Sequence, residues 1–420
     1  MSSTRRARTL GVGAAVRAFN DLAVPGLGGV WFGKQLVLAT LGVMLAQDKT
    51  GKRISNIAMA NAVEALACCM TLNHRPNKAL LDGRLRGSTK LRGKDDLRFS
   101  VVNRPGFYVT QPMRMASVQT LPALGLVEAS ATRFNSFDIT PLGRELVDKA
   151  VGRQVVIALV EWVAGPSNMN NAAVRKALSP LTDLPEAAQE IIASALQQGS
   201  PKEDAQHKNR RRAALAWVES LRINDSPAAN SVNWTTKPAV IGEAHWMDLR
   251  AGALFQSTRD AAIDVLLCIE KLLNTHPRQL PLNHPLPAVA TTTINNLRTK
   301  AQAFITFGHP QAEAKAFCLE CVDTDDTRLL CKLVARDDRV LQLRQEAVVP
   351  GPAFETASGI SLNPEQSIGG AIEPAPDQYQ ISWPDGMSRR LNNLFLLNAD
   401  LHQNMTLWIN KLETTPGDNA

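Results

Sequence analysis

The sequence predicts a mainly α-helical protein of several domains with only a few short strands. Its 420 residues exceed the roughly 100–200 residues of one domain and can bury a large core. A hydrophobic content of 45% and a charged content of 20% are typical of globular proteins. Apolar residues recur at helical spacing along most of the chain. Together these observations exclude a fully disordered chain, a collagen, a disulfide scaffold and a multispanning membrane protein.

The N-terminal region, residues 1–72, is predicted to be helical around a glycine-rich turn. Ser55 is a suitable N-cap for a helix over 57–72, whose apolar positions repeat at helical spacing. The apolar stretch 22–45 is interrupted at Pro25 and by five glycines, so its unbroken part is too short to span a bilayer. The sequence therefore predicts a core helix and no membrane contact.

Gly28, Gly33 and Lys34 have the spacing of a phosphate-binding loop. However, Gln35 stands where such a loop carries the Ser or Thr that holds magnesium, and no apolar strand precedes the loop. We therefore interpret the glycines as a tight turn between helices and expect no nucleotide cofactor.

The positive charge of the chain is concentrated in one segment. The formal net charge is +7, and residues 74–98 carry eight basic and three acidic side chains, a net +5. Such a segment attracts phosphate backbones or other acidic partners, and the alternative is a solvated surface loop. Smaller basic clusters lie at Arg5, Arg6 and Arg8 and at residues 208–212.

Residues 107–150 follow the order helix, strand, turn, strand, helix. The expected elements are a helix over 111–124, strands over 126–128 and 134–139, and a helix from 141. Gly125 is a normal C-terminal residue for the first helix, although Pro122 would kink that helix or end it earlier. Thr140 is a suitable N-cap for the last helix, with Pro141 in its first position.

This order, with the phrases Leu-Gly-Leu-Val-Glu and Ile-Thr-Pro-Leu-Gly, resembles the second half of a winged-helix domain of bacterial transcription regulators. The resemblance implies that the helix over 111–124 enters the major groove with Arg114 and Gln119, and that Arg133 lies on the wing. A winged-helix fold used for protein contact or as a scaffold is the alternative. With the basic segment, the resemblance defines a module over 73–152.

The remaining chain divides at changes in composition. The predicted regions are a helical region over 153–223, a helical or mixed domain over 234–349, a linker over 350–378 and a C-terminal helical segment over 379–420. Residues 224–233 are rich in Pro, Asn and Ser, as at a boundary. The terminal segment carries an apolar stripe between 387 and 412, which is suited to docking in the groove of a partner protein.

The sequence carries no constellation that indicates catalysis. Six cysteines are too few for a disulfide framework, which indicates a reducing cytoplasm. Cys318, Cys321 and Cys331 contain one Cys-x-x-Cys pair without a second pair. A metal site there stays open, with packing in the core as the favoured alternative. We expect no catalytic residue and no cofactor.

These observations predict a non-catalytic protein that binds nucleic acid, specifically double-stranded DNA. The contacts are assigned to Arg75, Lys78, Arg84, Arg86, Lys90, Arg92, Lys94, Arg114, Gln119 and Arg133. The alternative is a structural or adaptor subunit of a multi-protein bacterial defence or mobile-element complex, which docks through residues 387–412.

Overall fold

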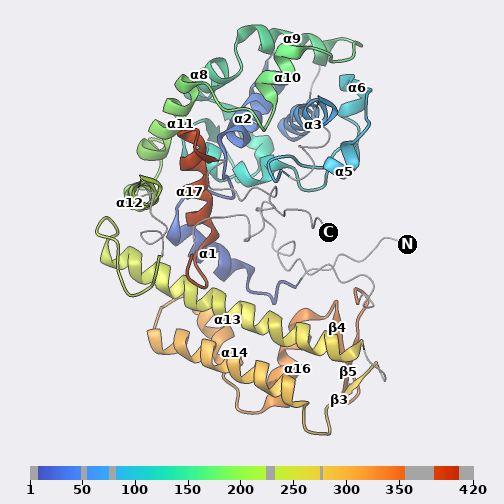
Figure 1. The fold of residues 1–420 in the computed structure, drawn as a ribbon, viewed down its shortest axis with the longest axis vertical. Coiled ribbons are helices and arrows are strands. Elements are labelled where there is room, and N and C mark those ends of the chain that lie inside the picture. Colours follow the sequence, from blue (N-terminus) through green and yellow to red (C-terminus); the bar gives the residue numbers. More distant parts are fainter. Residues whose placement is uncertain are drawn as a thin grey trace, which may run out of the picture.

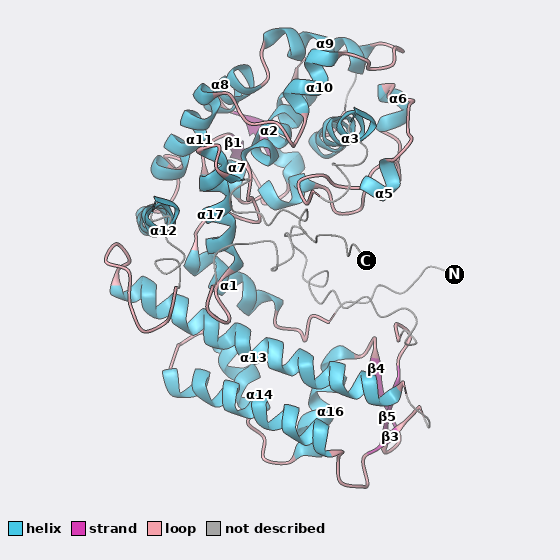
Figure 2. Cartoon of the chain, viewed as in Figure 1, coloured by secondary structure: helices cyan, strands magenta, loops and turns pink. Residues whose placement is uncertain are grey.

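The computed structural model describes residues 8–48, 54–74, 82–223, 232–274, 278–354 and 383–405. The chain is mainly helical with a few short strands, which confirms the predicted class (Figure 1). The strands form one hairpin among the N-terminal helices and one small sheet beside the C-terminal helices (Figure 2). In the part of the chain that is described, no helix has both the length and the apolar character needed to cross a bilayer.

Two buried helices lie at the centre of the N-terminal half. These are α2 (Gly33–Gln47) and α3 (Asn56–His74), and side chains are buried around nearly all of their surface. The two helices approach closely at Gly42, where an added Cβ would lie 2.4 Å from the Cα of Ala60. Ser55 caps α3 as predicted, because its Oγ accepts from the backbone N–H of Ala58 at 3.3 Å.

A shell of further helices surrounds this pair and completes what we call the first core. Its helices are α5 (Ser88–Leu91), α6 (Phe99–Val102), α8 (Pro141–Ala150), α9 (Arg153–Ala164), α10 (Ala172–Leu178), α11 (Glu186–Gln198), α12 (Ala205–Ile223) and α17 (Arg389–Leu401). The predicted regions 1–72, 73–152 and 153–223 thus contribute to one continuous apolar cluster.

The second core lies under a helix of 31 residues, α13 (Glu243–Leu273). Its other elements are α1 (Gly13–Ala23), α14 (Ala288–Phe307), α15 (Ala312–Cys321), α16 (Asp326–Asp337) and strands β3 (Leu280–Pro281), β4 (Leu341–Arg344) and β5 (Ala347–Pro350). The strands form an antiparallel sheet in the order β3-β5-β4. Of the predicted linker, residues 355–378 lie outside the described residues.

The two cores share α13 and are joined by polar contacts. Trp246 of α13 belongs to the first core, whereas Phe255 of the same helix belongs to the second. Asp248 lies between them and accepts from Arg210 of α12 at 2.6 Å and from His309 at 3.0 Å. Figure 1 shows α13 crossing the molecule between the two groups of helices.

The C-terminal helix α17 is an integral part of the first core. Leu391, Leu394 and Leu397 are each fully buried against the chain's own helices. The prediction that the apolar stripe of 387–412 docks in another protein is therefore wrong for its described part, because intramolecular packing already buries that stripe. Residues 406–412 lie outside the described residues.

Candidate nucleic-acid interface

The predicted groove-reading helix over 111–124 is not continuous. The structure has a 3₁₀ turn, η1 (Met113–Ser117), and a separate single turn, α7 (Thr120–Ala123). Pro122 explains the break, since a proline lacks the N–H that would bond to the carbonyl four residues earlier, and its ring clashes there. The prediction of one helix is corrected to two short turns that pack mainly on α2 and α3.

The predicted pair of strands and the helix that follows them are present, and both strands are short. Strand β1 (Val127–Ala129) pairs with β2 (Phe137–Ile139) in an antiparallel register. Residues 134–136 form a 3₁₀ turn, η2 (Phe134–Ser136), instead of the start of the returning strand. Thr140 caps α8 as predicted, because its Oγ1 accepts from the N–H of Gly143 at 3.0 Å and Pro141 follows it.

A buried glutamate holds the start of η1. Glu64 of α3 is 2% exposed, and its carboxylate accepts from the N–H groups of Met113 at 2.5 Å and Arg114 at 3.0 Å. It also accepts from the Tyr108 hydroxyl at 2.7 Å. Burial raises the pKa of Glu64, and these hydrogen bonds oppose that rise. Sequence reasoning missed this residue, although a lone acid within an apolar helix was its signal.

The two residues assigned to base contacts are engaged within the chain. Arg114 donates from Nε to the side-chain oxygen of Asn61 at 2.5 Å, and its guanidinium lies 5.5 Å from the Phe134 ring centroid. Burial lowers the pKa of Arg114. The side-chain oxygen of Gln119 accepts from Arg390 of α17 at 2.7 Å. Both side chains are therefore engaged in tertiary contacts.

The basic segment divides into buried and exposed members. Arg84 forms an ion pair with Asp82 at 2.7 Å, and its side chain is 11% exposed. Arg86 is 8% exposed. Arg75 and Lys78 lie outside the described residues. Arg84 and Arg86 thus support the fold of this segment. The sequence analysis had assigned both residues to nucleic-acid contacts at the surface.

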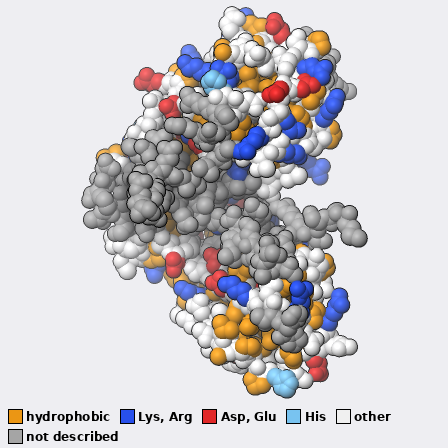
Figure 3. Space-filling model, turned by 45° about the vertical axis from the view of Figure 1, so that its right-hand side comes forward, with side chains coloured by type: hydrophobic (Ala, Val, Ile, Leu, Met, Phe, Trp, Pro, Cys, Tyr) orange, Lys and Arg blue, Asp and Glu red, His pale blue; other side chains and the backbone are white. Residues whose placement is uncertain are grey.

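Lys90, Arg92 and Lys94 remain at the surface around α5. Lys90 donates to the backbone oxygen of Tyr108 at 2.8 Å, and the Lys94 ammonium lies 4.5 Å from the Phe107 ring centroid. Arg92 is exposed. None of the three forms an ion pair with a carboxylate in the described part of the chain. Lysine and arginine side chains gather on this side of the molecule in Figure 3.

Arg104, just after α6, is exposed and adds a fourth cation without an ion pair to a described residue, which sequence reasoning missed. Its Nε donates to the backbone oxygen of Ser100 at 3.2 Å, and no ion pair joins it to a described carboxylate. The nearby Asp96 is already paired with Arg98 at 2.6 Å. We call Lys90, Arg92, Lys94 and Arg104 the α5–α6 cationic surface. Sequence reasoning missed Arg104 because it lies outside residues 74–98, where the basic side chains are concentrated.

Arg133 is exposed but lies far from this surface. The side chain of Asn56, at the start of α3, donates to the backbone oxygen of Phe134, the residue after Arg133. The side chain of Asn73, near the end of α3, donates to the backbone oxygen of Lys94 at 3.0 Å. At 1.5 Å per residue these two positions are about 25 Å apart along α3. The structure therefore does not bring Arg133 together with Lys90, Arg92 and Lys94.

The other basic clusters are partly neutralised: Lys208 and Arg212 form no ion pair with a described residue, whereas their neighbours do. Arg8 is buried and pairs with Glu270 at 2.8 Å and with Asp337 at 3.4 Å. Arg210 pairs with Asp248, and the fully buried Arg211 pairs with Glu203. Arg5 and Arg6 lie outside the described residues.

The cysteine cluster is split between two helices of the second core. Cys318 and Cys321 on α15 are buried, and burial raises the pKa of the Cys318 thiol to about 12. Cys331 lies on α16 and is half-buried. Within the described ranges, no three His, Cys, Asp or Glu side chains are grouped so that they could hold a metal ion.

Lys34, the lysine with phosphate-loop spacing, is directed into the protein. It is 3% exposed, and its ammonium donates to the backbone oxygen of Ala177 at 2.6 Å. Burial lowers the pKa of Lys34 to about 8, and the charges of Asp400 and Asp183 oppose this shift. Lys34 is therefore a packed core residue. This agrees with the interpretation of the neighbouring glycines as a turn between helices.

The depressed pKa of Lys34 predicts a pH effect on stability. Between about pH 8 and the unfolded value of about 10.4, the unfolded chain binds more protons, so stability rises with pH. We expect wild-type protein to gain about 2–3 kcal/mol relative to K34M across this window, at 1.36 kcal/mol per pKa unit. Urea unfolding at a series of pH values measures the difference. A wild-type minus K34M difference that stays constant with pH would contradict the prediction, and exposed Lys176, as K176M, is the control.

Comparison with protein-family models, curated proteins and solved structures finds no match to this chain. The winged-helix resemblance of residues 107–150 therefore stays a prediction that rests on the hairpin and α8.

Proposed function

We propose that this protein binds nucleic acid through the α5–α6 cationic surface without catalysing a reaction. The observation that carries the proposal is that four cations without an ion-pairing carboxylate among the described residues lie within residues 90–104, whereas other unpaired cations are scattered over the described surface. Arg8, Arg84, Arg210 and Arg211 are each matched by a carboxylate. Lys90, Arg92, Lys94 and Arg104 form no such ion pair with any described residue. Cations without a fixed counter-charge are free to neutralise phosphates.

The contacts we propose are to phosphates rather than to base edges. Reading of the major groove needs a helix or ribbon that presents free side chains. Residues 113–123 form two short turns, and Arg114 and Gln119 are committed to Asn61 and Arg390. The aromatic rings beside the surface, Phe107 and Tyr108, are buried, which leaves no stacking platform there. The best-supported partner is therefore a double-stranded backbone bound with little sequence preference.

A salt titration tests this proposal. Each phosphate that a Lys or Arg neutralises adds about 0.9 to the slope of log affinity against log salt. We expect K90Q/R92Q/K94Q/R104Q to reduce that slope by about 3–4 units, measured by fluorescence anisotropy of a labelled 20-base-pair duplex between about 50 and 200 mM salt. A variant with the wild-type slope, or wild-type protein that fails to bind the duplex, would overturn the proposal.

The matched control removes the same charge from exposed cations elsewhere. K149Q/R153Q/K176Q/K315Q changes four exposed side chains on α8, α9, α10 and α15. We expect it to change the slope by less than about one unit, because these residues do not lie on the α5–α6 cationic surface. Duplexes of two unrelated sequences are expected to bind with similar affinity.

We extend the proposal to a cytoplasmic location, which the free thiols of all six cysteines support.

A further inference from the structure

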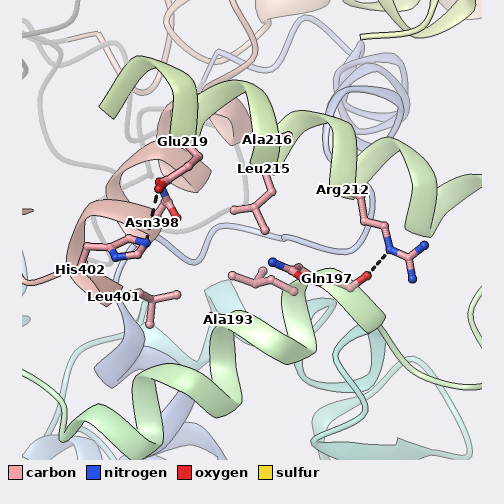
Figure 4. A pocket seen from close by; sticks show the side chains of 10 residues that line it. Ala193, Gln197, Arg212, Leu215, Ala216, Glu219, Asn398, Leu401 and His402 are labelled. Carbon is pink, nitrogen blue, oxygen red and sulfur yellow. Dashed lines mark hydrogen bonds and ion pairs between the residues drawn. The ribbon is translucent and has the colours of Figure 1, made fainter. Parts of the chain in front are cut away.

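A pocket of about 490 Å³ opens where α11, α12 and α17 meet (Figure 4). The apolar part of its lining consists of Leu196, Leu215, Leu401, Ala193 and Ala216. Small-molecule sites typically have volumes of about 300–1,000 Å³ and combine an apolar lining with a few polar groups. The pocket lies outside the α5–α6 cationic surface and shares no residue with it.

Among the described residues that line the pocket, Glu219 is the one carboxylate, and it is already hydrogen-bonded within the protein. Glu219 accepts from Arg222 at 2.6 and 2.8 Å and from the side chain of Asn398 at 2.6 Å. These hydrogen bonds, the one from Arg222 above all, lower the pKa of Glu219, so it stays ionised and paired. The Nε2 atom of His402 lies 3.8 Å from the same carboxylate. Glu219 is therefore less available to a cationic ligand.

The pocket retains a cation with unused hydrogen-bond donors. Arg212 donates from Nε to the backbone oxygen of Gln197 at 2.5 Å, which fixes the guanidinium at the end of α11. Its two terminal nitrogens form no hydrogen bond or ion pair with a described residue. Figure 4 shows Arg212 at one end of the pocket and Glu219 with His402 at the other. Arg212 and Glu219 cancel in the formal charge of the lining, and Arg222, which lies outside the lining, pairs with Glu219 and leaves Arg212 without a carboxylate partner among the described residues.

We propose that this pocket binds a small amphipathic monoanion. Its apolar body lies on Leu196, Leu215 and Leu401, and its carboxylate or sulfonate accepts from the terminal N–H groups of Arg212. A guanidinium suits this role because it presents parallel donors to a planar or tetrahedral anion. The apolar lining favours a ligand with an apolar body, and the pairing of Glu219 with Arg222 and Asn398 makes it a weaker partner for an amine head group than Arg212 is for an anion.

Titration with 8-anilinonaphthalene-1-sulfonate tests the proposal, because this probe carries a sulfonate on an apolar body and fluoresces when bound. The full-length wild-type chain is expected to show saturable binding that octanoate displaces. R212Q removes the charge and is expected to weaken binding about tenfold or more, the loss typical of a charge-assisted hydrogen bond. A216W fills the pocket from an exposed position and is expected to weaken it at least as much.

The control is K176Q, which removes an exposed cation on α10 and is expected to leave the affinity within about twofold. Thermal melts of all variants confirm that each one folds, since Arg212 and Ala216 are both exposed. Absence of saturable binding to wild-type protein would overturn the proposal, as would wild-type affinity in either R212Q or A216W. Duplex binding is measured in parallel, so failure here is distinguished from failure of the nucleic-acid proposal.

Discussion

R211M is expected to lower the free energy of unfolding by about 3–5 kcal/mol, the cost of breaking a buried ion pair by removing one partner. Arg211 on α12 is fully buried, and its Nη2 donates to Glu203 at 2.6 Å. It also donates to the backbone oxygens of Leu196 at 2.9 Å and Pro25 at 3.2 Å. Methionine fills a similar volume but leaves a nearly buried carboxylate and two carbonyl groups without donors.

Two further variants separate this ion pair from general damage to α12. R212M changes the next residue, which is exposed, and is expected to cost less than about 0.5 kcal/mol. E203Q/R211M removes both charges and is expected to recover part of the loss, because no unpaired carboxylate remains. Chemical denaturation measures all three. If R211M and R212M lower stability equally, the buried pair does not have the role assigned to it.

F255A is the second large effect, with an expected loss of about 3–5 kcal/mol for removal of a buried phenylalanine ring. Phe255 on α13 is fully buried at the centre of the second core. Its ring centroid lies 5.4 Å from that of Phe19, 5.9 Å from Phe304 and 6.2 Å from Phe317. The cavity left by alanine would therefore face α1, α14 and α15 together. L319A, on the exposed side of α15, is the control and is expected to cost less than about 0.5 kcal/mol.

The F255A variant also tests whether the two cores unfold together. The described tryptophans all lie in or against the first core, so their fluorescence reports on that core. Because α13 runs through both cores and Asp248 joins α12 to His309, we expect F255A to shift the fluorescence and circular dichroism midpoints together. A fluorescence midpoint that stays at the wild-type value would show that the first core unfolds on its own.

Local pattern was sufficient to place α3 and the start of α8. The apolar spacing of residues 57–72 predicted α3, and Ser55 and Thr140 cap α3 and α8 as their side chains predict. These features depend on neighbours within a few residues, which the sequence contains directly. The break at Pro122 also has a local cause, although the predicted helix over 111–124 ran through it.

The local sequence did not show which charged side chains are free to contact a partner. The sequence alone determined that the chain is mainly helical and that its positive charge is concentrated in residues 74–98. Only the tertiary structure decided that Arg86 is buried, that Gln119 binds Arg390, and that Arg104 joins the unpaired cations. The pocket lined by Arg212 likewise needs three helices from distant parts of the chain. The physical reason is that the pairing and burial of a side chain can depend on groups hundreds of residues away, as with Gln119 and Arg390, whereas helix formation depends on a few neighbouring residues.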